Sequence, residues 1–317
     1  MDRIYSSRRW WLLGALAAIG AGCTAGQATS SPDAHGSDAP LVDAPGATDG
    51  PLADAPNSEW QELTIVIAGQ SNSNNHQCST CTPQTFANAA RMEHLTPQGF
   101  VNVLTAMPTG KAGALYNFVG YGSSTYGGTG GGISFWPSVF EAILQGNQKR
   151  VRFVMLGEGS TSVFHWTGTR NDIVVNYMGD LMLRNRFMAV GALPQIDYVF
   201  WVQGETDNAL LVDKATYKSG LSALKAQAEQ LGMSQLARKP KWVIFPTLTN
   251  PSPTAPVRLA MQELASERPS EFLLGPDLDF PAGPDYPARG GYTHFDDYPV
   301  FHGAVTVIVA RLRALGF

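Results

Sequence analysis

The sequence predicts a three-layer α/β/α domain in which helices cover both faces of a mainly parallel β-sheet. Two observations lead to this fold class. Short apolar runs rich in β-branched residues, typical of buried strands, alternate with longer amphipathic stretches typical of helices. In addition, hydrophobic residues make up 44% of the 317 residues, which is enough to bury a sizeable core.

The first predicted strand, 63–68 (LTIVIA), is almost entirely apolar and is ended by Gly69. Because apolar side chains alternate onto both of its faces, we expect this strand to be buried within a parallel sheet. The other predicted strands are 152–156, 198–202 and 242–245, and the predicted helices are 137–144, 214–231, 256–266 and 300–315.

The segment 76–135 breaks the alternation of strand and helix. It is rich in Gly, Asn and Thr, and 127–132 contains a single residue other than glycine. Long irregular segments of compact domains are often functional, so we interpret this one as substrate-facing loops. Its two cysteines, Cys78 and Cys81, favour a local disulfide; a zinc site would need two further ligands, and only His76 is nearby.

Residues 1–23 have the parts of an export signal. Three arginines (Arg3, Arg8 and Arg9) precede the apolar run 10–19, and small residues follow it. The apolar run is too short to span a bilayer comfortably, which makes a transmembrane anchor the weaker interpretation. The pair Arg8-Arg9 before two tryptophans loosely resembles a twin-arginine signal.

The end of this signal, Gly-Ala-Gly-Cys at 20–23, resembles a bacterial lipobox, in which Cys23 is lipidated after cleavage. It departs from the usual pattern at Gly20, where leucine is common. The alternative is a plain secretory signal with a coincidental cysteine. We therefore expect an exported protein, anchored to a bacterial membrane as a lipoprotein or otherwise secreted or periplasmic, with no membrane contact except the lipid anchor.

Residues 24–59 are predicted to be a disordered linker ahead of the folded domain at 60–317. Asp-Ala-Pro recurs three times among small and polar residues, and so few large apolar residues cannot repay the entropy of ordering. The acidic excess behind the net charge of −4 is concentrated near this end. Because no run of Lys and Arg stands out beyond residue 60, nucleic-acid binding has no support.

Polar residues follow three predicted strands directly. In an open parallel sheet, ligands bind outside the carboxyl ends of the strands. Residues after these strands are therefore candidates for one site. They are Gln70, Ser71 and Asn72 after the first strand, Ser160 and its neighbours after the second, and Gln203, Glu205 and Asp207 after the third.

A serine hydroxyl is a weak nucleophile until a base removes its proton, so Ser71 would need a histidine. His294 stands in a glycine-containing loop just before the final predicted helix, where it could fold back over the sheet edge. His165 lies near the end of the second strand and could line the pocket. His302 lies within the final helix and is interpreted as a packing or surface residue, and His35 lies in the linker.

These blocks together resemble the sialate O-acetylesterases, a branch of the SGNH (GDSL-type) hydrolases that includes carbohydrate acetylesterases. The resemblance covers about 63–315 and rests on four blocks and one helix pattern. They are 69–72 (GQSN), 159–162 (GSTS) with Trp166, 203–207 (QGETD), 293–295 (THF), and Arg258 with Gln262.

The resemblance implies an SGNH-type fold and a serine esterase that removes acetyl groups from carbohydrate without a metal or cofactor. Ser71 matches the family nucleophile and His294 the family base. The backbone N–H of Ser71, Gly132 in the glycine loop and Gln203 match the oxyanion hole. Beside this machinery we expect supporting or pocket-lining positions at Gln70, Asn72, Ser160, Glu205 and Asp207.

One departure concerns the base. The family often carries Asp three residues before this histidine, but Gly291 stands there. Asp279 resembles a family aspartate that follows the last strand and is the candidate acid partner; a dyad oriented by a backbone carbonyl is the alternative. The missing aspartate also motivates a second hypothesis, a non-catalytic glycan-binding lipoprotein on a degenerate SGNH scaffold.

Overall fold

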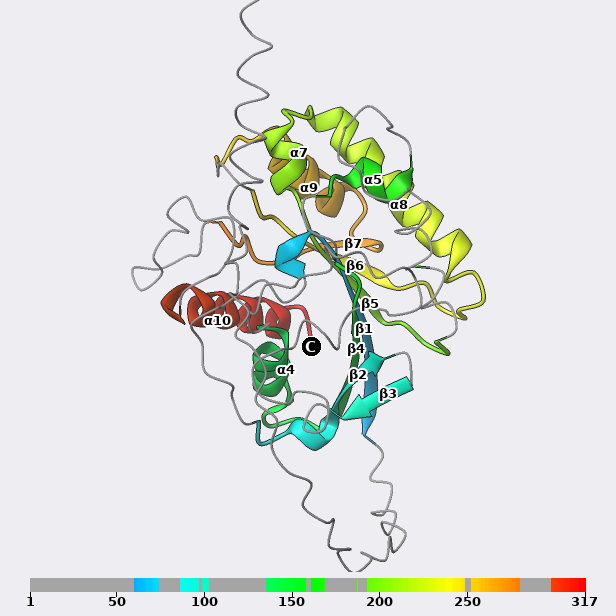
Figure 1. The fold of residues 1–317 in the computed structure, drawn as a ribbon, viewed down its shortest axis with the longest axis vertical. Coiled ribbons are helices and arrows are strands. Elements are labelled where there is room, and N and C mark those ends of the chain that lie inside the picture. The colour runs from blue at the N-terminus through cyan, green and yellow to red at the C-terminus, as the bar shows by residue number, and fades with distance from the viewer. Residues whose placement is uncertain are drawn as a thin grey trace, which may run out of the picture. The chain divides into compact units, whose positions relative to one another are not determined.

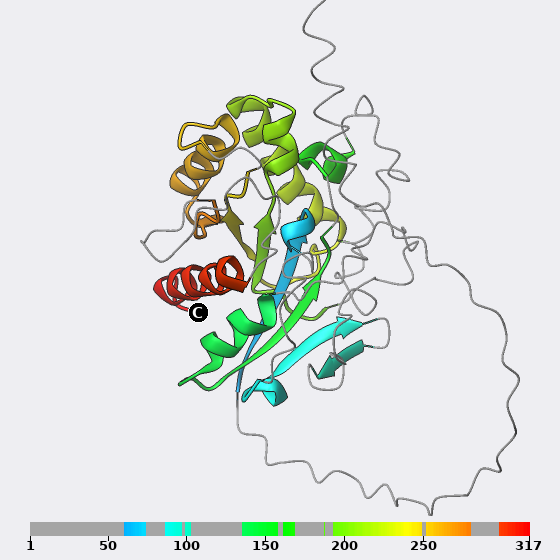
Figure 2. The same ribbon diagram turned by 60° about the vertical axis from the view of Figure 1, so that its left-hand side comes forward.

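A seven-stranded β-sheet lies at the centre of the structure, in the order β3-β2-β4-β1-β5-β6-β7. Every neighbouring pair is parallel except β2 and β3, which are antiparallel. Helices cover both faces of the sheet (Figures 1 and 2), so the predicted three-layer α/β/α fold is confirmed. The strands are β1 (Gln61–Gly69), β2 (Met92–Thr96), β3 (Gly99–Asn102), β4 (Lys149–Met155), β5 (Tyr198–Val202), β6 (Lys241–Phe245) and β7 (Phe272–Leu274).

The helices divide between the two faces of the sheet. On one face α4 packs beside α10, and on the other α8 packs against both α5 and α9 (Figure 1). There are also two short 3-10 helices: η2 follows β1, and η3 directly precedes β2. The bounds are η2 (Ser71–Ser73), η3 (Ala89–Arg91), α4 (Trp136–Leu144), α5 (Val163–Thr167), α7 (Glu205–Ala209), α8 (Lys214–Leu231), α9 (Pro256–Glu267) and α10 (Tyr298–Ala314).

This computed structural model describes residues 60–73, 86–96, 99–102, 135–157, 161–168, 187, 193–248, 252–279 and 298–317. The predictions made for 1–59 and for Cys78 and Cys81 lie outside these residues and stay predictions. Within the described ranges, no helix is long and apolar enough to cross a membrane. The same ranges contain no group of three or more His, Cys, Asp or Glu side chains that could hold a metal ion.

Strand β1 explains why the sheet is covered on both sides. Ile65 and Ile67 belong to the core beneath α4 and α10, whereas Val66 and Ala68 belong to the core beneath α8 and α9. All four side chains are fully buried. A strand with two apolar faces is stable only between two layers of helices, as the sequence pattern indicates.

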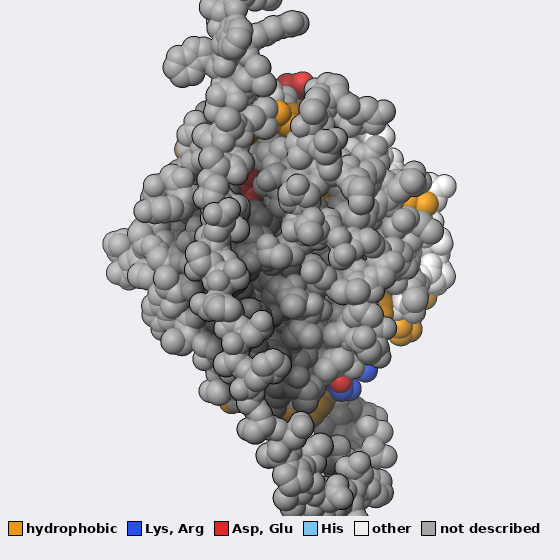
Figure 3. All heavy atoms as spheres, viewed as in Figure 1, with side chains coloured by type: hydrophobic (Ala, Val, Ile, Leu, Met, Phe, Trp, Pro, Cys, Tyr) orange, Lys and Arg blue, Asp and Glu red, His pale blue; other side chains and the backbone are white. Residues whose placement is uncertain are grey.

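The interpretation of 76–135 as loops alone is wrong, because β2 and β3 add two strands to one edge of the sheet. Their sequences, MEHLT and GFVN, lack the apolar run of a central strand. Pairing is supported instead by charge: Glu93 accepts hydrogen bonds from Arg150 and Arg152 of the neighbouring β4, the latter at 2.8 Å. Figure 3 shows side chains of both charges beside one another near this end of the sheet.

Acid should weaken the ion pairs between α8 and α9. Hydrogen bonds from Lys214 and then Lys218 lower the pKa of Glu263 from 4.5 to about 2. Because the pKa is lower in the folded state, the contribution of this carboxylate to stability is present above pH 4.5 and is lost as the pH falls toward about 2. The group lies at the surface, so we expect a small effect that salt screens.

Thermal denaturation of the wild type and of Glu263→Gln measures this effect. We expect the melting temperature of the wild type to fall more steeply over that pH range. The difference should shrink in about 1 M NaCl, where the Debye length is near 3 Å. Parallel curves for the two proteins at low salt would contradict the prediction.

Candidate active site

The carboxyl ends of β1, β5 and β6 bring together residues that are more than 100 positions apart in the sequence. Because β5 lies between β1 and β6 and all three are parallel, their ends meet at one edge of the sheet. Gln70, Asn72, Gln203, Glu205 and Asp207 are all at most 3% exposed there. Hydrogen bonds join Gln203 to Gln70 and Asp207, and a separate one joins Asn72 to Glu205. The sequence predicted all five side chains for one site.

The two neighbours of Ser71 are each tied to the chain that follows β5. The Gln70 N–H donates to Val202 O at 2.9 Å, and Gln70 Oε1 accepts from Thr206 N at 3.1 Å. Asn72 Nδ2 donates to Glu205 Oε1 at 2.6 Å. The backbone of Ser71, the first residue of η2, is therefore held from both sides.

Two glycines allow the strand ends to approach this closely. Gly69 has φ 133°, and a Cβ built on it would lie 2.1 Å from Val202 O. Gly204 has φ 152°, and its Cβ would lie 2.8 Å from Thr247 O. A side chain at either position would meet backbone atoms and would require a conformation that L-residues avoid. Glycine is thus needed directly before Gln70 and before Glu205.

Gln203 is enclosed by a network of buried polar groups. Its Nε2 donates to Asp207 Oδ2, to Thr161 O at 3.1 Å and to Gln70 Oε1 at 3.3 Å. Its Oε1 accepts from the Tyr217 hydroxyl at 2.9 Å. Burial raises the pKa of Tyr217 well above its usual value, and this keeps the phenol a neutral donor. The network fixes the orientation of the Gln203 amide.

Asp207 extends this network to the start of α5. Its Oδ2 accepts from Val163 N at 3.0 Å. At the same helix terminus Ser162 is the N-cap, and His165 Nδ1 accepts from Ser162 N at 2.9 Å in a capping box. His165 is 6% exposed, so the expectation that it lines an open pocket is corrected: it caps a helix inside the protein.

Trp166, which accompanies the block 159–162 in the sequence, is buried as well. It is 1% exposed and stacks edge-on against Trp201 and Phe187 within the core. Its Nε1 donates to Thr161 Oγ1 at 2.9 Å, which anchors the residue whose carbonyl binds Gln203. Trp166 therefore stabilises the polar network through Thr161.

Asp279 is 1% exposed and is held by two donors. Its Oδ2 accepts from Leu248 N at 2.7 Å and from Arg258 Nη2 at 2.8 Å. Arg258, in α9, also pairs with Asp277 and donates from Nε to Ser252 O at 3.0 Å. The candidate acid is thereby attached to the segment that follows β6, at the same edge of the sheet.

Several predicted site residues lie outside the described part of the chain. They are His294, Gly132 and Ser160, together with the side chain of Ser71. Their roles stay predictions. Thr161, in the block 159–162 that the sequence singled out, contacts the network as well. Conversely, the sequence did not point to Tyr217 or Thr247, which also contact these residues. Nothing in their local sequence marks these two, since Tyr217 lies in a helix and Thr247 in a loop.

Removing the carboxylate of Glu205 should disturb the support of Ser71. Glu205 Oε1 accepts from both Asn72 and Thr247, so Glu205→Ala leaves buried donors without this acceptor. We expect a loss of about 1–3 kcal/mol in stability. We also expect kcat/KM for the proposed ester hydrolysis to fall by about 10- to 100-fold, because the turn that carries Ser71 loses one of its anchors.

Glu205→Gln is the matched variant, since its amide oxygen can still accept these hydrogen bonds. It should recover most of the kcat lost in Glu205→Ala when both are assayed well below their melting temperatures. Equal kcat values for Glu205→Ala and the wild type would show that this contact does not position Ser71.

No protein-family model matches the sequence, and no curated protein matches it. Three solved structures are similar in fold: a protein from Arabidopsis thaliana (TM-score 0.49, 12% identity), a carbohydrate acetylesterase from Xanthomonas citri (0.44, 13%) and an aryl esterase from M. smegmatis (0.40, 12%). Each match covers 80% of this chain, and they cover 96%, 57% and 99% of the respective partner chains. The chain thus spans little more than half of the Xanthomonas citri enzyme. At 12–13% identity the likeness concerns the fold alone.

Proposed function

We propose that this chain is a serine esterase that removes acetyl groups from O-acetylated carbohydrate outside the cytoplasm, with Ser71 as nucleophile. The observation that supports it most is the pair of buried contacts on either side of Ser71, from Gln70 to Thr206 N and from Asn72 to Glu205. A nucleophile must be held in one geometry for efficient attack, and rigid neighbours provide this.

In the proposed reaction His294 takes the proton of the Ser71 hydroxyl as the oxygen attacks the acetyl carbonyl carbon. The negative oxygen that forms is stabilised by the Ser71 N–H, Gly132 and Gln203. When the C–O bond to the sugar breaks, His294 passes the proton to the departing sugar oxygen, which leaves as a hydroxyl. In the second step His294 takes a proton from water as the water oxygen attacks the acetyl-serine carbonyl carbon. It then gives this proton to the Ser71 oxygen as that ester bond breaks and acetate is released.

The oxyanion role of Gln203 carries a structural condition. An amide nitrogen has two hydrogens, and Nε2 shares them among three acceptors. The contact with Gln70 Oε1 is the longest of these, at 3.3 Å. For Gln203 to donate to substrate, this contact is the one we expect to be exchanged. Otherwise the Ser71 and Gly132 N–H groups form the hole and Gln203 positions the Ser71 turn.

The remaining parts of the proposal concern the acid and the membrane. Asp279 is the proposed partner of His294, and its contacts with Leu248 N and Arg258 keep its carboxylate in one orientation.

Residues 1–23 direct export, and lipidated Cys23 anchors the protein. Cys23→Ala should then move the protein from the membrane fraction to the soluble fraction of the cells that produce it.

Two measurements test the esterase itself. The purified protein should release acetate from acetylated xylan or acetylated sialic acid and hydrolyse p-nitrophenyl acetate. A fluorophosphonate probe should label one serine, and mass spectrometry should locate the label on Ser71. Labelling of another serine would overturn the assignment of the nucleophile. Binding of acetylated glycan with neither acetate release nor labelling would favour the alternative, a glycan-binding lipoprotein on a degenerate scaffold.

A further inference from the structure

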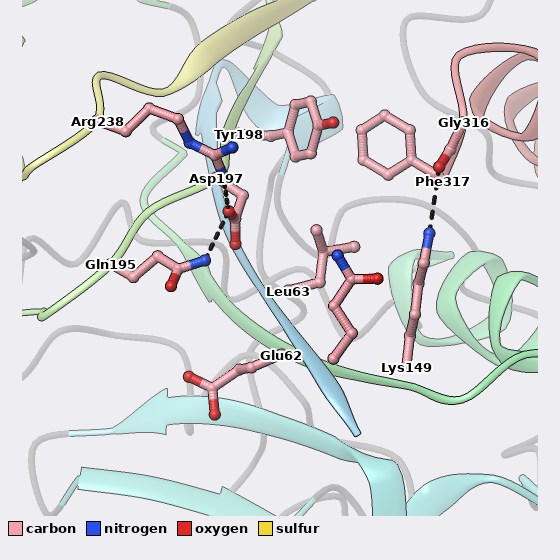
Figure 4. A pocket seen from close by; sticks show the side chains of 10 residues that line it. Glu62, Leu63, Lys149, Gln195, Asp197, Tyr198, Arg238, Gly316 and Phe317 are labelled. Atoms are coloured by element: carbon pink, nitrogen blue, oxygen red, sulfur yellow. Dashed lines mark hydrogen bonds and ion pairs between the residues drawn. The ribbon is translucent and has the colours of Figure 1, made fainter. Parts of the chain in front are cut away.

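A second candidate site lies at the opposite end of the strands. A pocket of about 360 Å³ is lined by the amino-terminal ends of β1, β4 and β5, the loops before β5 and β6, and the residues after α10 (Figure 4). Ligand pockets usually measure about 300–1,000 Å³, so this one suits a molecule of one or two rings. Because the strands are parallel, it is separated from the Ser71 turn by the length of the sheet.

The two acids of the pocket are already paired within the protein. Asp197 Oδ1 accepts from Arg238 Nη2 at 2.5 Å and from Gln195 Nε2 at 2.6 Å, and its Oδ2 accepts from Thr64 N at 2.9 Å. Glu62 accepts from Arg152 Nη1 at 2.8 Å. In Figure 4 the Glu62 carboxylate points away from Lys149. Asp197 therefore has little acceptor capacity left, and Glu62 is directed to Arg152.

Lys149 is the one basic residue of the pocket lining that takes no part in these ion pairs. Its Nζ donates to the carbonyl oxygen of Gly316 at 3.2 Å, and among the described residues no carboxylate lies within ion-pair distance of it. An ammonium group has three donors and a full charge, so it can also bind an anion. Arg238 pairs with Asp197, and Arg152 pairs with Glu62, so neither acid is an ion-pair partner of Lys149.

The rest of the lining combines planar polar groups with an aromatic surface. The rings of Tyr198 and Phe317 lie 4.2 Å apart between centroids, and Leu63 lies beside them in the pocket. Opposite them, Gln195 and the guanidinium of Arg238 are oriented by Asp197 (Figure 4). Amide and guanidinium groups suit neighbouring hydroxyls, and aromatic rings suit the apolar face of a sugar ring.

We propose that this pocket binds a sugar acid, a pyranose carrying one carboxylate. The carboxylate is directed to Lys149, the hydroxyls face Gln195 and Arg238, and one face of the ring lies against Phe317 and Tyr198. A simple aliphatic acid would leave the amide of Gln195 and the guanidinium of Arg238 unused, and a neutral sugar would leave Lys149 unpaired. The proposal does not depend on the esterase function of the other edge.

Isothermal titration calorimetry of the full chain with D-glucuronate and D-glucose tests this directly, because the two sugars differ in the carboxylate. We expect saturable binding of D-glucuronate, at least about tenfold tighter than that of D-glucose, as one charge-assisted hydrogen bond implies. Equal affinity for the two sugars, or no saturable binding of D-glucuronate at about 10 mM, would overturn the proposal.

Variants locate the binding on the protein. Lys149→Gln should weaken D-glucuronate binding at least about tenfold. Lys241→Gln, at the start of β6 but outside the pocket, removes the same charge and should leave binding unchanged. Equal losses in both variants, or none in Lys149→Gln, would contradict the assignment. If Lys149→Gln does not fold, the titration of the wild type with the two sugars still tests the proposal. Ser71→Ala should bind D-glucuronate as the wild type does, which separates this site from the esterase.

Discussion

Replacing Ser71 with alanine should lower kcat for the proposed acetyl ester hydrolysis by about a thousandfold or more, because the proposed acetyl-serine intermediate can no longer form. The remaining rate would come from binding and from the oxyanion donors alone. The stability of the protein should change little, since the turn is held through Gln70 and Asn72. Initial rates of acetate release, measured together with thermal denaturation, provide both quantities.

Ser73→Ala is the matched control for this substitution, in the same short helix two residues further on. The Ser73 hydroxyl donates to Gln70 O at 2.6 Å, so its loss should cost about 1 kcal/mol of stability. The Ser73→Ala variant should nevertheless retain the proposed activity within about tenfold. If Ser71→Ala kept wild-type kcat, or if Ser73→Ala lost as much as Ser71→Ala, Ser71 would not be the nucleophile.

Elements with a strong local pattern were predicted well from the sequence. The apolar run in 63–68 became β1, and the amphipathic stretch 214–231 has the same bounds as α8. Elements without such a pattern were missed. β7 has only three residues, and β2 depends on Glu93 meeting Arg150 and Arg152, which lie 57 and 59 positions further along the chain. Contacts between residues so far apart cannot be predicted from a local sequence pattern.

The candidate site, too, was predicted only in part from the sequence. Its location at the strand ends followed from the positions of Gln70, Asn72 and Gln203, because parallel strands place their carboxyl ends at one edge. The partners within the site did not follow. Asn72 meets Glu205 across 133 positions, and Tyr217 reaches Gln203 from the middle of a helix. Which donor faces which acceptor depends on strand order and register, and both are properties of the assembled sheet.

Replacing Arg258 with methionine should lower the free energy of unfolding by about 3–5 kcal/mol. The Arg258 side chain is 2% exposed and pairs with Asp279, whose side chain is fully buried, and with Asp277. Methionine fills a similar space but leaves the Asp279 carboxylate buried without its cation, which is the costly way to break such a pair. Chemical denaturation gives the free energy, and the melting temperature should fall by roughly 10 °C.

Arg268→Met is the control, because it removes the cation of an exposed ion pair instead of a buried one. Arg268 pairs with Glu271, but both side chains are more than a third exposed, so its loss should cost less than about 1 kcal/mol. The double variant Arg258→Met with Asp279→Asn should recover part of the stability, because it removes the uncompensated charge. If Arg258→Met cost no more than Arg268→Met, the buried pair would not be what attaches the segment after β7 to α9.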